Sequence, residues 1–429
     1  MPIPYNLAAE IARRLSKGAN VADLKDALAP TSHDERPIPP PVPGRGETND
    51  DAVRKRIEFL EEFAGPLPHL SGEAPQPGAE ELAGNIENLI GMTCIPTGVV
   101  GPLRINGLHA HGDFYVPMAT SEGALVASYS RGAKIVTLAG GAACLTTVQQ
   151  VQRAPGFAFN TMAEAIQFTA WVVGEFEQIR DVAESTTQHG RLVNMRVQPQ
   201  ANFVYLILDF YPGDASGQNM VTFAAQAACE DLIQRTPVLP RHWFIDSNMS
   251  GDKKGTSLSF FDTRGRHTTA EVTLPRSLVE ESLRTTPERI GDAWRMGVIG
   301  GIQTGSIGVS GHVANAVAAV FLACGQDVAC VSEASTALHR MEVTETGDLY
   351  ACVTLPNLIL GTVGGGTRLP TATESLRILG CLGNDGAAKL AEITAGLALA
   401  GEISIMAAMC TGEFAQAHEA LGRPKQDPR

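Results

Sequence analysis

RLVNMRVQPQANFVYLILDFY, residues 191–211, is the stretch that decides the fold, because apolar and polar residues alternate through it as they do in β-strands. The alternation predicts two strands joined by a turn. Helical stretches flank this pair, at Thr161–Arg180 before it and at Met220–Gln234 after it. A strand pair with helices packed against it predicts a small α+β domain over residues 156–245.

The segments on either side of this block, residues 81–155 and 246–410, are expected to form one larger domain. Helical patterns cover Val313–Cys324 and Ala388–Met409, and strand-like runs cover Asp113–Pro117 and Asp348–Leu360. We therefore expect an α+β fold in which a large, mainly helical domain is split in sequence by the small one.

The two ends of the chain differ from this core. Residues 1–80 predict a helical arm, with helices over Asn6–Leu28 and Asp50–Phe63 joined by the proline-rich segment Arg36–Pro43, which breaks any regular element. Residues 411–429 form a polar tail.

Composition limits the classes of partner. The chain has 429 residues, a formal net charge of −13, 44% hydrophobic and 18% charged residues. Its acidic balance argues against a nucleic-acid surface. The N-terminus lacks the apolar region of a signal peptide, and no apolar run approaches the roughly 20 residues of a membrane span. We expect a soluble, cytoplasmic protein with no membrane partner.

The eight cysteines are scattered through apolar segments. None forms a Cys-x-x-Cys pair and no Cys/His cluster has zinc-ligand spacing, so we expect reduced, mostly buried thiols and no metal site.

Two short segments in the middle of the chain favour a site where two ligands meet. DASGQNM, residues 214–220, is a small-residue turn that begins with a carboxylate, and such a turn suits a phosphate-bearing cofactor. Asp252-Lys253-Lys254 follows a run of turn-forming residues, and a constrained lysine suits an anionic or oxyanionic substrate. A surface ion pair is the alternative interpretation of the second segment.

Other candidate residues are ambiguous by themselves. GTVGGGT, residues 361–367, is either a phosphate-cradling loop or turn architecture, and it is neither a Gly-x-Gly-x-x-Gly fingerprint nor a P-loop. Glu122 fits the first turn of a helix over Ala119–Arg131, which Ser121 could cap. Asp327 is either a buried, partnered carboxylate or a surface residue at a helix end. His418 lies in the polar tail, where a solvated histidine is the ordinary interpretation.

Taken in order along the chain, these segments resemble the 3-hydroxy-3-methylglutaryl-coenzyme A (HMG-CoA) reductases. The resemblance runs from about Glu87 to Arg423. It includes ENLIG at 87–91, IPTGVVGPL at 95–103, MATSEGALVAS at 118–128 and LAGEISIMAA at 399–408, besides the motifs above.

The resemblance implies a four-electron reduction of the HMG-CoA thioester to mevalonate and free coenzyme A, with NADPH, or alternatively NADH, as the cofactor. By residue-by-residue similarity, Lys253 would stabilise the oxyanion, Asp327 would hydrogen-bond this lysine and Glu122 would supply a proton. His418 would protonate the departing thiolate, and the tail of residues 411–429 would close over the substrate.

It also implies binding residues, and the small domain, with an expected ferredoxin-like arrangement, would bind the cofactor. The substrate-contacting positions would be Glu87, Arg131, Lys134, Arg153, Asp246, Asn248, Lys254 and Asn315. The cofactor-contacting positions would be Thr187, Gln188, Asp214, Ser216, Gly217, Asn219, Met220, Gly364, Gly365 and Gly366. Family members place the site at a subunit interface, with 87–91 contributed across it, which implies a homodimer or larger assembly.

The departures from the family pattern affect residues expected to recognise the cofactor and the substrate. Gln188 stands where family members have an arginine for the 2′-phosphate of NADPH, and a neutral amide offers no such charge-assisted contact. A lysine expected near Arg295-Met296 is absent. Two alternatives therefore stand beside HMG-CoA reduction: a homologue that reduces a different acyl-CoA in a specialised pathway, and a catalytically silent binding subunit.

Overall fold

The structure is a computed structural model that describes residues 21–413 and 419, so the expected position of His418 lies outside the described residues. The helices are α2 (Val21–Ala27), α3 (Asp50–Ala64), α4 (Leu125–Leu138), α5 (Met162–Val172), α6 (Phe176–Ser185), α7 (Gln218–Arg235), α8 (Arg276–Leu278), α9 (Pro287–Thr304), α10 (Val313–Ala323), α11 (Val331–Ala334), α12 (Pro370–Ile378) and α13 (Gly386–Thr411). The strands are β1 (Thr97–Gly107), β2 (His111–Ala119), β3 (Ala142–Arg153), β4 (Gly156–Ala158), β5 (Arg191–Gln200), β6 (Phe203–Tyr211), β7 (His242–Phe244), β8 (Gly265–Leu274), β9 (Leu338–Val343) and β10 (Leu349–Leu358).

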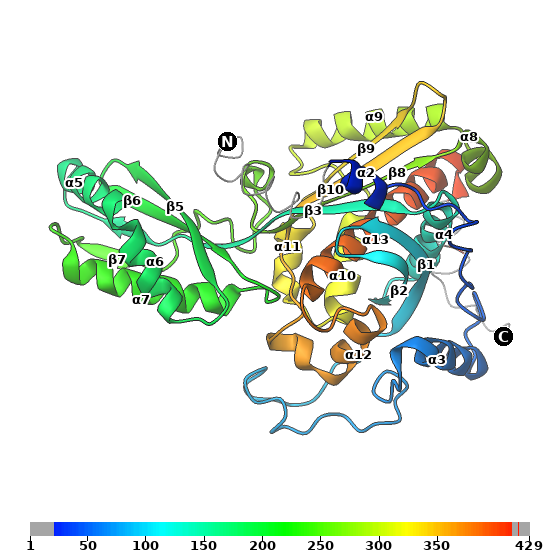
Figure 1. Cartoon of the computed structure of the whole chain (residues 1–429), viewed down its shortest axis with the longest axis horizontal. Coiled ribbons are helices and arrows are strands. Elements are labelled where there is room, and N and C mark those ends of the chain that lie inside the picture. The colour runs from blue at the N-terminus through cyan, green and yellow to red at the C-terminus, as the bar shows by residue number, and fades with distance from the viewer. Residues whose placement is uncertain (1–20, 414–418, 420–429) are drawn as a thin grey trace.

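One long strand, β3, joins the two halves of the sheet (Figure 1). Residues 143–150 of β3 pair with β8, whereas residues 151–153 pair with β6. The sheet order is β7-β4-β6-β3-β8-β10-β9, with β1 beside β3, β2 beside β1 and β5 beside β6. This strand therefore crosses from one half of the molecule to the other.

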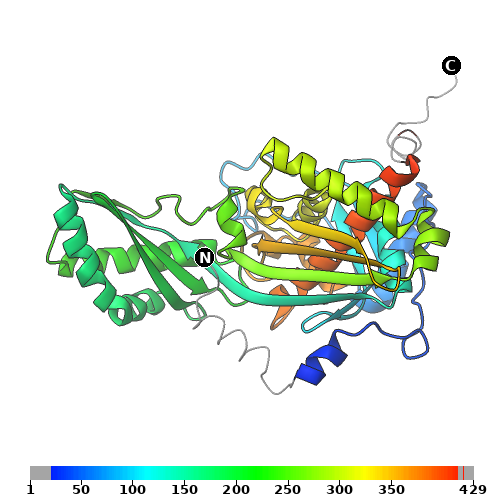
Figure 2. The same cartoon turned by 90° about the horizontal axis from the view of Figure 1, so that it is seen from above.

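The elements from β4 to β7 project from the rest of the molecule (Figures 1 and 2). Their four strands are antiparallel neighbours in the order β7-β4-β6-β5. The helices α5 and α6 pack on these strands, and α7 packs on α6 and β3. The β5–β6 hairpin is the stretch 191–211, and its turn contains Ala201 with a left-handed backbone (φ 52°).

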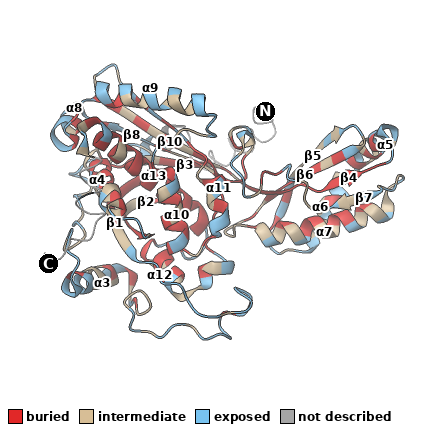
Figure 3. Cartoon of the chain, turned by 180° about the vertical axis from the view of Figure 1, so that it is seen from behind, coloured by how far each residue is buried: buried red, intermediate tan, exposed pale blue. Residues whose placement is uncertain are grey.

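The opposite half is built around α13, which is largely buried along its length (Figure 3). It packs against α4, α10 and β8. It is also the one helix in residues 21–413 that is long and apolar enough to cross a membrane, but 89% of its most apolar window is buried inside the protein. Its apolar composition is explained by burial in this core.

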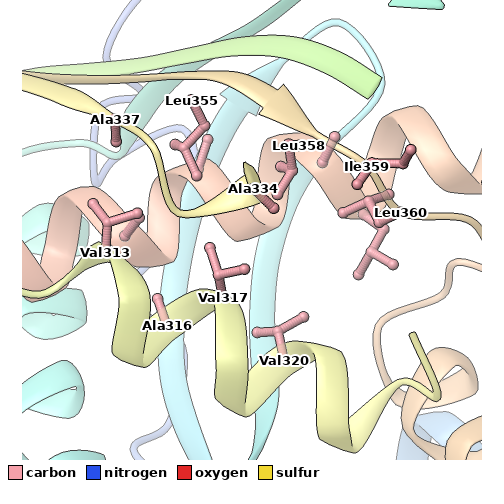
Figure 4. Packing of buried hydrophobic residues seen from close by; sticks show 14 of the residues in the cluster. Val313, Ala316, Val317, Val320, Ala334, Ala337, Leu355, Leu358, Ile359 and Leu360 are labelled. Carbon is pink, nitrogen blue, oxygen red and sulfur yellow. The ribbon is translucent and has the colours of Figure 1, made fainter. Parts of the chain in front are cut away.

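The inner face of α10 also packs into this core (Figure 4). Val313, Ala316, Val317 and Val320 face residues that end or follow α11, or that lie on and after β10: Ala334, Ala337, Leu355, Leu358, Ile359 and Leu360. Small and β-branched side chains let α10 lie close to its neighbours, which fixes the helix that leads to Asp327.

Most predicted elements are confirmed, including the hairpin, α3, α7, α10, β10 and α13. A 3₁₀ turn, Val173–Glu175, interrupts the predicted helix Thr161–Arg180. The structure describes only Val21–Ala27 as helix from the predicted Asn6–Leu28.

One predicted helix start is wrong. The helix expected from Ala119 begins only at Leu125, because Ala119 ends β2 and Ala124 adopts a left-handed backbone (φ 67°). Glu122 therefore lies in the preceding loop rather than in a first helical turn, and Ser121 caps no helix. The large half also contains the strands β1, β3, β8 and β9, which the sequence did not predict.

Candidate active site

The ion pair between Lys253 and Asp327 joins two segments that are 74 positions apart in the sequence. Lys253 Nζ lies 2.9 Å from Asp327 Oδ2, with both side chains a little under half exposed. Asp327 also accepts a 3.0 Å hydrogen bond from the Ala329 N–H at the start of a short 3₁₀ helix. Asp327 is therefore a partnered carboxylate at a helix end, which combines the two interpretations left open by its sequence.

This contact keeps both groups charged. The hydrogen bond from Lys253 to Asp327 raises the pKa of Lys253, against the opposing effect of partial burial. Partial burial acts to raise the pKa of Asp327, but the hydrogen bonds from Lys253 and from the Ala329 N–H outweigh it and lower that pKa. An ammonium held in this state can stabilise negative charge that develops on a substrate oxygen.

The backbone of Lys253 lies in the left-handed region, with φ of 57°. A lysine adopts this conformation only where its surroundings enforce it. Its N–H donates a 3.1 Å hydrogen bond to Glu333 Oε1, and Glu333 is fully buried.

Arg264, which is 1% exposed, is the centre of the network beneath this lysine. Its guanidinium donates to Glu333 Oε1 at 2.6 Å and to Gln218 Oε1 at 2.6 Å, and it lies 2.8 Å from Asp252 Oδ1. Lys253 is thereby connected through Glu333 and through its neighbour Asp252 to one buried cation.

Arg153 at the end of β3 holds the loop that precedes the lysine. Its Nη1 lies 2.6 Å from Asp246 Oδ2 and 3.2 Å from Asp252 Oδ2. Asn248, with a left-handed backbone (φ 63°), donates its N–H to Asp246 Oδ1. Of the predicted substrate residues, these three therefore lie in contact.

Lys254 points differently from Lys253. Its Nζ donates to the carbonyl oxygen of Asp252 at 2.9 Å, and the side chain is exposed.

Glu122 and Asn315 form a second site pair. Asn315 Nδ2 donates a 2.7 Å hydrogen bond to Glu122 Oε2. Both line a cavity of about 380 Å³ whose walls also include Cys94, Leu125 and Leu322. The cavity follows α10 from Asn315 toward its C-terminal end.

The two pairs lie toward opposite ends of α10. Asn315 is in the first turn of the helix, whereas Asp327 follows its last residue, Ala323, by four positions. The helical rise separates Asn315 from Ala323 by about 12 Å. Between residues 21 and 413, no hydrogen bond or ion pair connects Glu122 with Lys253.

The two predicted cofactor segments lie against each other. Ala215 and Val363 form a parallel bridge, and the Thr362 N–H donates to the carbonyl oxygen of Asp214 at 2.8 Å. A Cβ on Gly361 would come within 2.4 Å of the Ser216 nitrogen, so only glycine permits this approach.

The glycines that follow Val363 leave their backbone uncovered. Gly364 and Gly365 have φ of 81° and 53°, and among the described residues no atom beyond their chain neighbours lies within 4 Å of where their Cβ atoms would be. Accessible glycine backbone beside a helix start suits a phosphate-bearing group. That start is Gly217, the N-cap of α7, which is followed by Asn219 and Met220 in the first turn.

Asp214 and the segment around Gln188 border the predicted cofactor site. The carboxylate of Asp214 accepts 3.0 Å hydrogen bonds from the N–H groups of Asp385 and Ala387 at the start of α13. Asp214 therefore anchors the turn to the core. Thr187 and the exposed Gln188 precede Gly190, whose hypothetical Cβ would lie 2.3 Å from Met220 Sδ, so this loop packs on the cofactor turn.

The remaining predicted residues lie on other surfaces. Arg131 on α4 binds the carbonyl oxygen of Ser404 and lies 3.3 Å from Glu413 Oε2, and Lys134 is exposed one turn later. Glu87 is exposed in an irregular segment. Residues 21–413 contain no group of three or more His, Cys, Asp or Glu side chains that could hold a metal ion.

Sequence reasoning missed Arg264, Glu333 and Gln218. Glu333 was detectable as the lone acidic residue in the short segment that follows Asp327, and Gln218 lies inside the DASGQNM turn. Arg264 has no such signal, since Arg264 and Arg266 are separated by one glycine in an unremarkable polar run.

The chain is similar in sequence to a family of known proteins. The family model described as hydroxymethylglutaryl-coenzyme A reductase matches residues 52–423. The 3-hydroxy-3-methylglutaryl-coenzyme A reductase of Methanothermobacter thermautotrophicus is 42% identical over 380 residues, which cover 87% of this chain and 94% of the relative. The enzyme of the same name from Aeropyrum pernix is 40% identical over 413 residues, covering 95% and 97%.

The fold has solved counterparts. A structure of the class II 3-hydroxy-3-methylglutaryl-CoA reductase from Streptococcus pneumoniae, bound to NADPH in open conformations, superimposes with a TM-score of 0.66 at 19% identity, covering 83% of this chain and 96% of that one. The similarity in sequence extends over nearly the whole length of the archaeal relatives. The chain belongs to the hydroxymethylglutaryl-coenzyme A reductase family.

Proposed function

We propose that this protein reduces 3-hydroxy-3-methylglutaryl-CoA to mevalonate and free coenzyme A in the mevalonate route to isoprenoids. The observation that carries the proposal is the Lys253–Asp327 pair, an ammonium held charged on a constrained backbone. Family membership and the names of the archaeal relatives identify the substrate.

Lys253 donates to the thioester oxygen and stabilises the negative charge that forms there as hydride reaches the carbonyl carbon. Asp327 keeps the lysine protonated through this step. Glu122, aligned by Asn315, supplies a proton to the oxygen, and His418 protonates the leaving thiolate. Two hydrides and two protons convert the thioester into an alcohol and a thiol, so the overall reaction balances with two NAD(P)H.

The cradle between the Asp214 turn and the Gly361–Thr367 loop binds the cofactor, which supplies hydride when bound. Its open glycine backbone and the helix start at Gly217 fit a dinucleotide phosphate. NADPH is the proposed cofactor, as in the pneumococcal structure, with NADH as the alternative. The choice between NADPH and NADH can be tested by substitution of Gln188.

The domain assignment follows from these sites. We propose residues 81–155 and 246–410 as the substrate domain, 156–245 as the cofactor domain and 1–80 as an arm. The predicted closing tail, residues 411–429, lies mostly outside the described residues. The antiparallel strand order β7-β4-β6-β5 with intervening helices supports a ferredoxin-like cofactor domain.

The active site is shared between two subunits of a cytoplasmic homodimer or larger assembly. Two observations support this. Glu122 and Lys253 lie toward opposite ends of α10, and the segment around Glu87 exposes Ile86, Ile90 and Met92 to solvent, with Ile90 fully exposed. Arg131 and Lys134 on α4 face the coenzyme A phosphates.

The decisive assay follows nicotinamide absorbance with purified protein, HMG-CoA, and NADPH or NADH in turn. Oxidation that disappears in Lys253→Ala supports the enzyme. A different acyl-CoA oxidising cofactor faster than HMG-CoA would favour the specialised homologue, and no oxidation with either cofactor would favour the silent binding subunit.

A further inference from the structure

A buried pair of charges beneath the lysine has no role in the mechanism above. Arg264 is 1% exposed and Glu333 is fully buried, and their contact is 2.6 Å long. Arg264 Nε and Glu333 Oε2 are both buried and have no hydrogen-bond partner within residues 21–413. A buried pair that leaves polar atoms unsatisfied is weak evidence for stabilisation, so its contacts must be examined for another role.

Those contacts converge on the backbone of Lys253. Glu333 Oε1 accepts both the Lys253 N–H and Arg264 Nη1, so one oxygen joins the strained residue to the buried guanidinium. The second guanidinium nitrogen lies 2.8 Å from Asp252 Oδ1, on the residue that immediately precedes Lys253. The lysine is therefore held from its own nitrogen and from the preceding side chain.

The same cation reaches the cofactor turn. Arg264 Nη2 donates to Gln218 Oε1 at 2.6 Å, and Gln218 Nε2 lies 3.5 Å from Cys330 Sγ in the 3₁₀ turn that Asp327 caps. Gln218 is the first residue of α7, directly after Gly217.

We propose that Glu333 and Arg264 are positioning residues. They hold the backbone of Lys253 in its left-handed conformation, so that its ammonium contacts Asp327 and the substrate oxygen. Through Gln218 they also connect this arrangement to the cofactor turn. The inference rests on the proposed function, because it assigns these side chains a role through Lys253. Misplacement of a reacting group by about 1 Å is sufficient to lower a rate by roughly 100-fold.

The primary test is Glu333→Gln in the full-length protein. The amide keeps the size of the side chain but loses the charge that holds Arg264. We expect kcat to fall roughly 10- to 100-fold with little change in the KM for HMG-CoA, and the alkaline limb of the kcat–pH profile to move to lower pH. Around Lys253 the titratable groups are Asp327, Cys330 and Asp252, and only Asp327 is hydrogen-bonded to its ammonium.

A matched control separates positioning from stability. Arg104 is also fully buried and pairs with Asp113 at 2.8 Å, on β1 and β2 and away from the proposed site. Arg104→Lys should lower Tm without moving the pH profile of kcat. Gln218→Leu is the second variant, and it leaves the Arg264–Glu333 pair in place. It should lower kcat less than Glu333→Gln does and should move the alkaline limb of the kcat–pH profile in the same direction. It decides the case if Glu333→Gln does not fold.

The outcomes are distinguishable. If the wild type is active and Lys253→Ala is not, but Glu333→Gln and Gln218→Leu keep the wild-type kcat and alkaline limb, the positioning role is wrong while the proposed function stands. If the wild type oxidises no cofactor, the proposed function itself fails.

Discussion

Lys253 Nζ lies 2.9 Å from Asp327 Oδ2, and this ion pair has both partners a little under half exposed to solvent. A pair so exposed contributes at most about 1 kcal/mol to stability. Its position on a strained backbone, beside the loop held by Arg153, favours a chemical rather than a stabilising role.

Lys253→Ala should therefore separate activity from stability. Loss of the oxyanion donor predicts a fall in kcat of about 10²–10³-fold, whereas the free energy of unfolding should change by less than about 1 kcal/mol. Steady-state kinetics and urea denaturation measure the two. Lys55→Ala, at an exposed position on α3, is the control and should leave both unchanged.

Asp327→Asn should change the pH dependence of kcat. Asp327 raises the pKa of Lys253, so removing the carboxylate charge lowers that pKa. Lys253 must be protonated to act, and the alkaline limb of the profile should consequently move to lower pH. An unchanged limb, with kcat still reduced, would mean that Asp327 acts on another proton.

Glu122→Gln tests the proton donor in the cavity. An amide retains the hydrogen bond to Asn315 but transfers no proton, so kcat should fall about 10²–10⁴-fold while the cavity is preserved. Glu58→Gln, at an exposed position on α3, serves as the comparison. Equal kcat in the two variants would remove Glu122 from the mechanism.

Gln188→Arg should shift preference toward NADPH. A guanidinium on this exposed loop beside the cofactor turn would add a charge-assisted contact to a 2′-phosphate, worth about 1.5–3 kcal/mol or roughly 10-fold or more in the ratio of kcat/KM for NADPH to that for NADH. The gain should shrink as salt rises. No change in the ratio would mean that the 2′-position lies elsewhere.

The buried carboxyl group of Glu392 should make the stability of the folded protein depend on pH, and this effect does not involve catalysis. Burial raises the pKa of this α13 carboxyl to about 7, although its oxygens accept N–H groups from Ala110, His109 and Thr146. Because the folded-state pKa lies above the unfolded value, this contribution to stability is complete below pH 4.5 and is lost as pH rises toward 7.

Glu392→Gln should accordingly flatten the dependence of the unfolding free energy on pH between about 4.5 and 7. It should also destabilise the protein, by about 1–3 kcal/mol, because the amide NH₂ faces a backbone donor. Denaturation series at several pH values check this, and a slope equal to that of the wild type would contradict it.

The sequence predicted the parts of the fold that follow from local pattern. The β5–β6 hairpin alternates apolar and polar residues and α13 is one long apolar run, so both were predicted correctly. β1 was missed because TGVVGPLRING contains Gly101 and Pro102, yet a register shift between Val100 and Leu103 accommodates them. Glu122 was assigned to a helix because nothing local signals the left-handed Ala124 that delays α4.

The residues of the candidate site also fall into those that were predicted from the sequence and those that could not be. The resemblance identified Lys253 and Asp327, and the structure brings them into contact. Arg264 and Glu333 could not be identified, because their role depends on a contact between the residue that precedes β8 and α11 beneath the lysine loop. Likewise, the anchoring of Asp214 to α13 depends on a contact between residues more than 170 positions apart.

The most direct test of the central claim is the stoichiometry of one complete reaction. Purified protein is mixed with a limiting amount of HMG-CoA and excess NADPH, or NADH in a parallel sample, and oxidised cofactor and free thiol are quantified together. The account predicts two cofactor molecules oxidised for each thiol released, and both products should form about 10²–10³-fold more slowly with Lys253→Ala. Thiol release without cofactor oxidation, or equal turnover by Lys253→Ala, would contradict it.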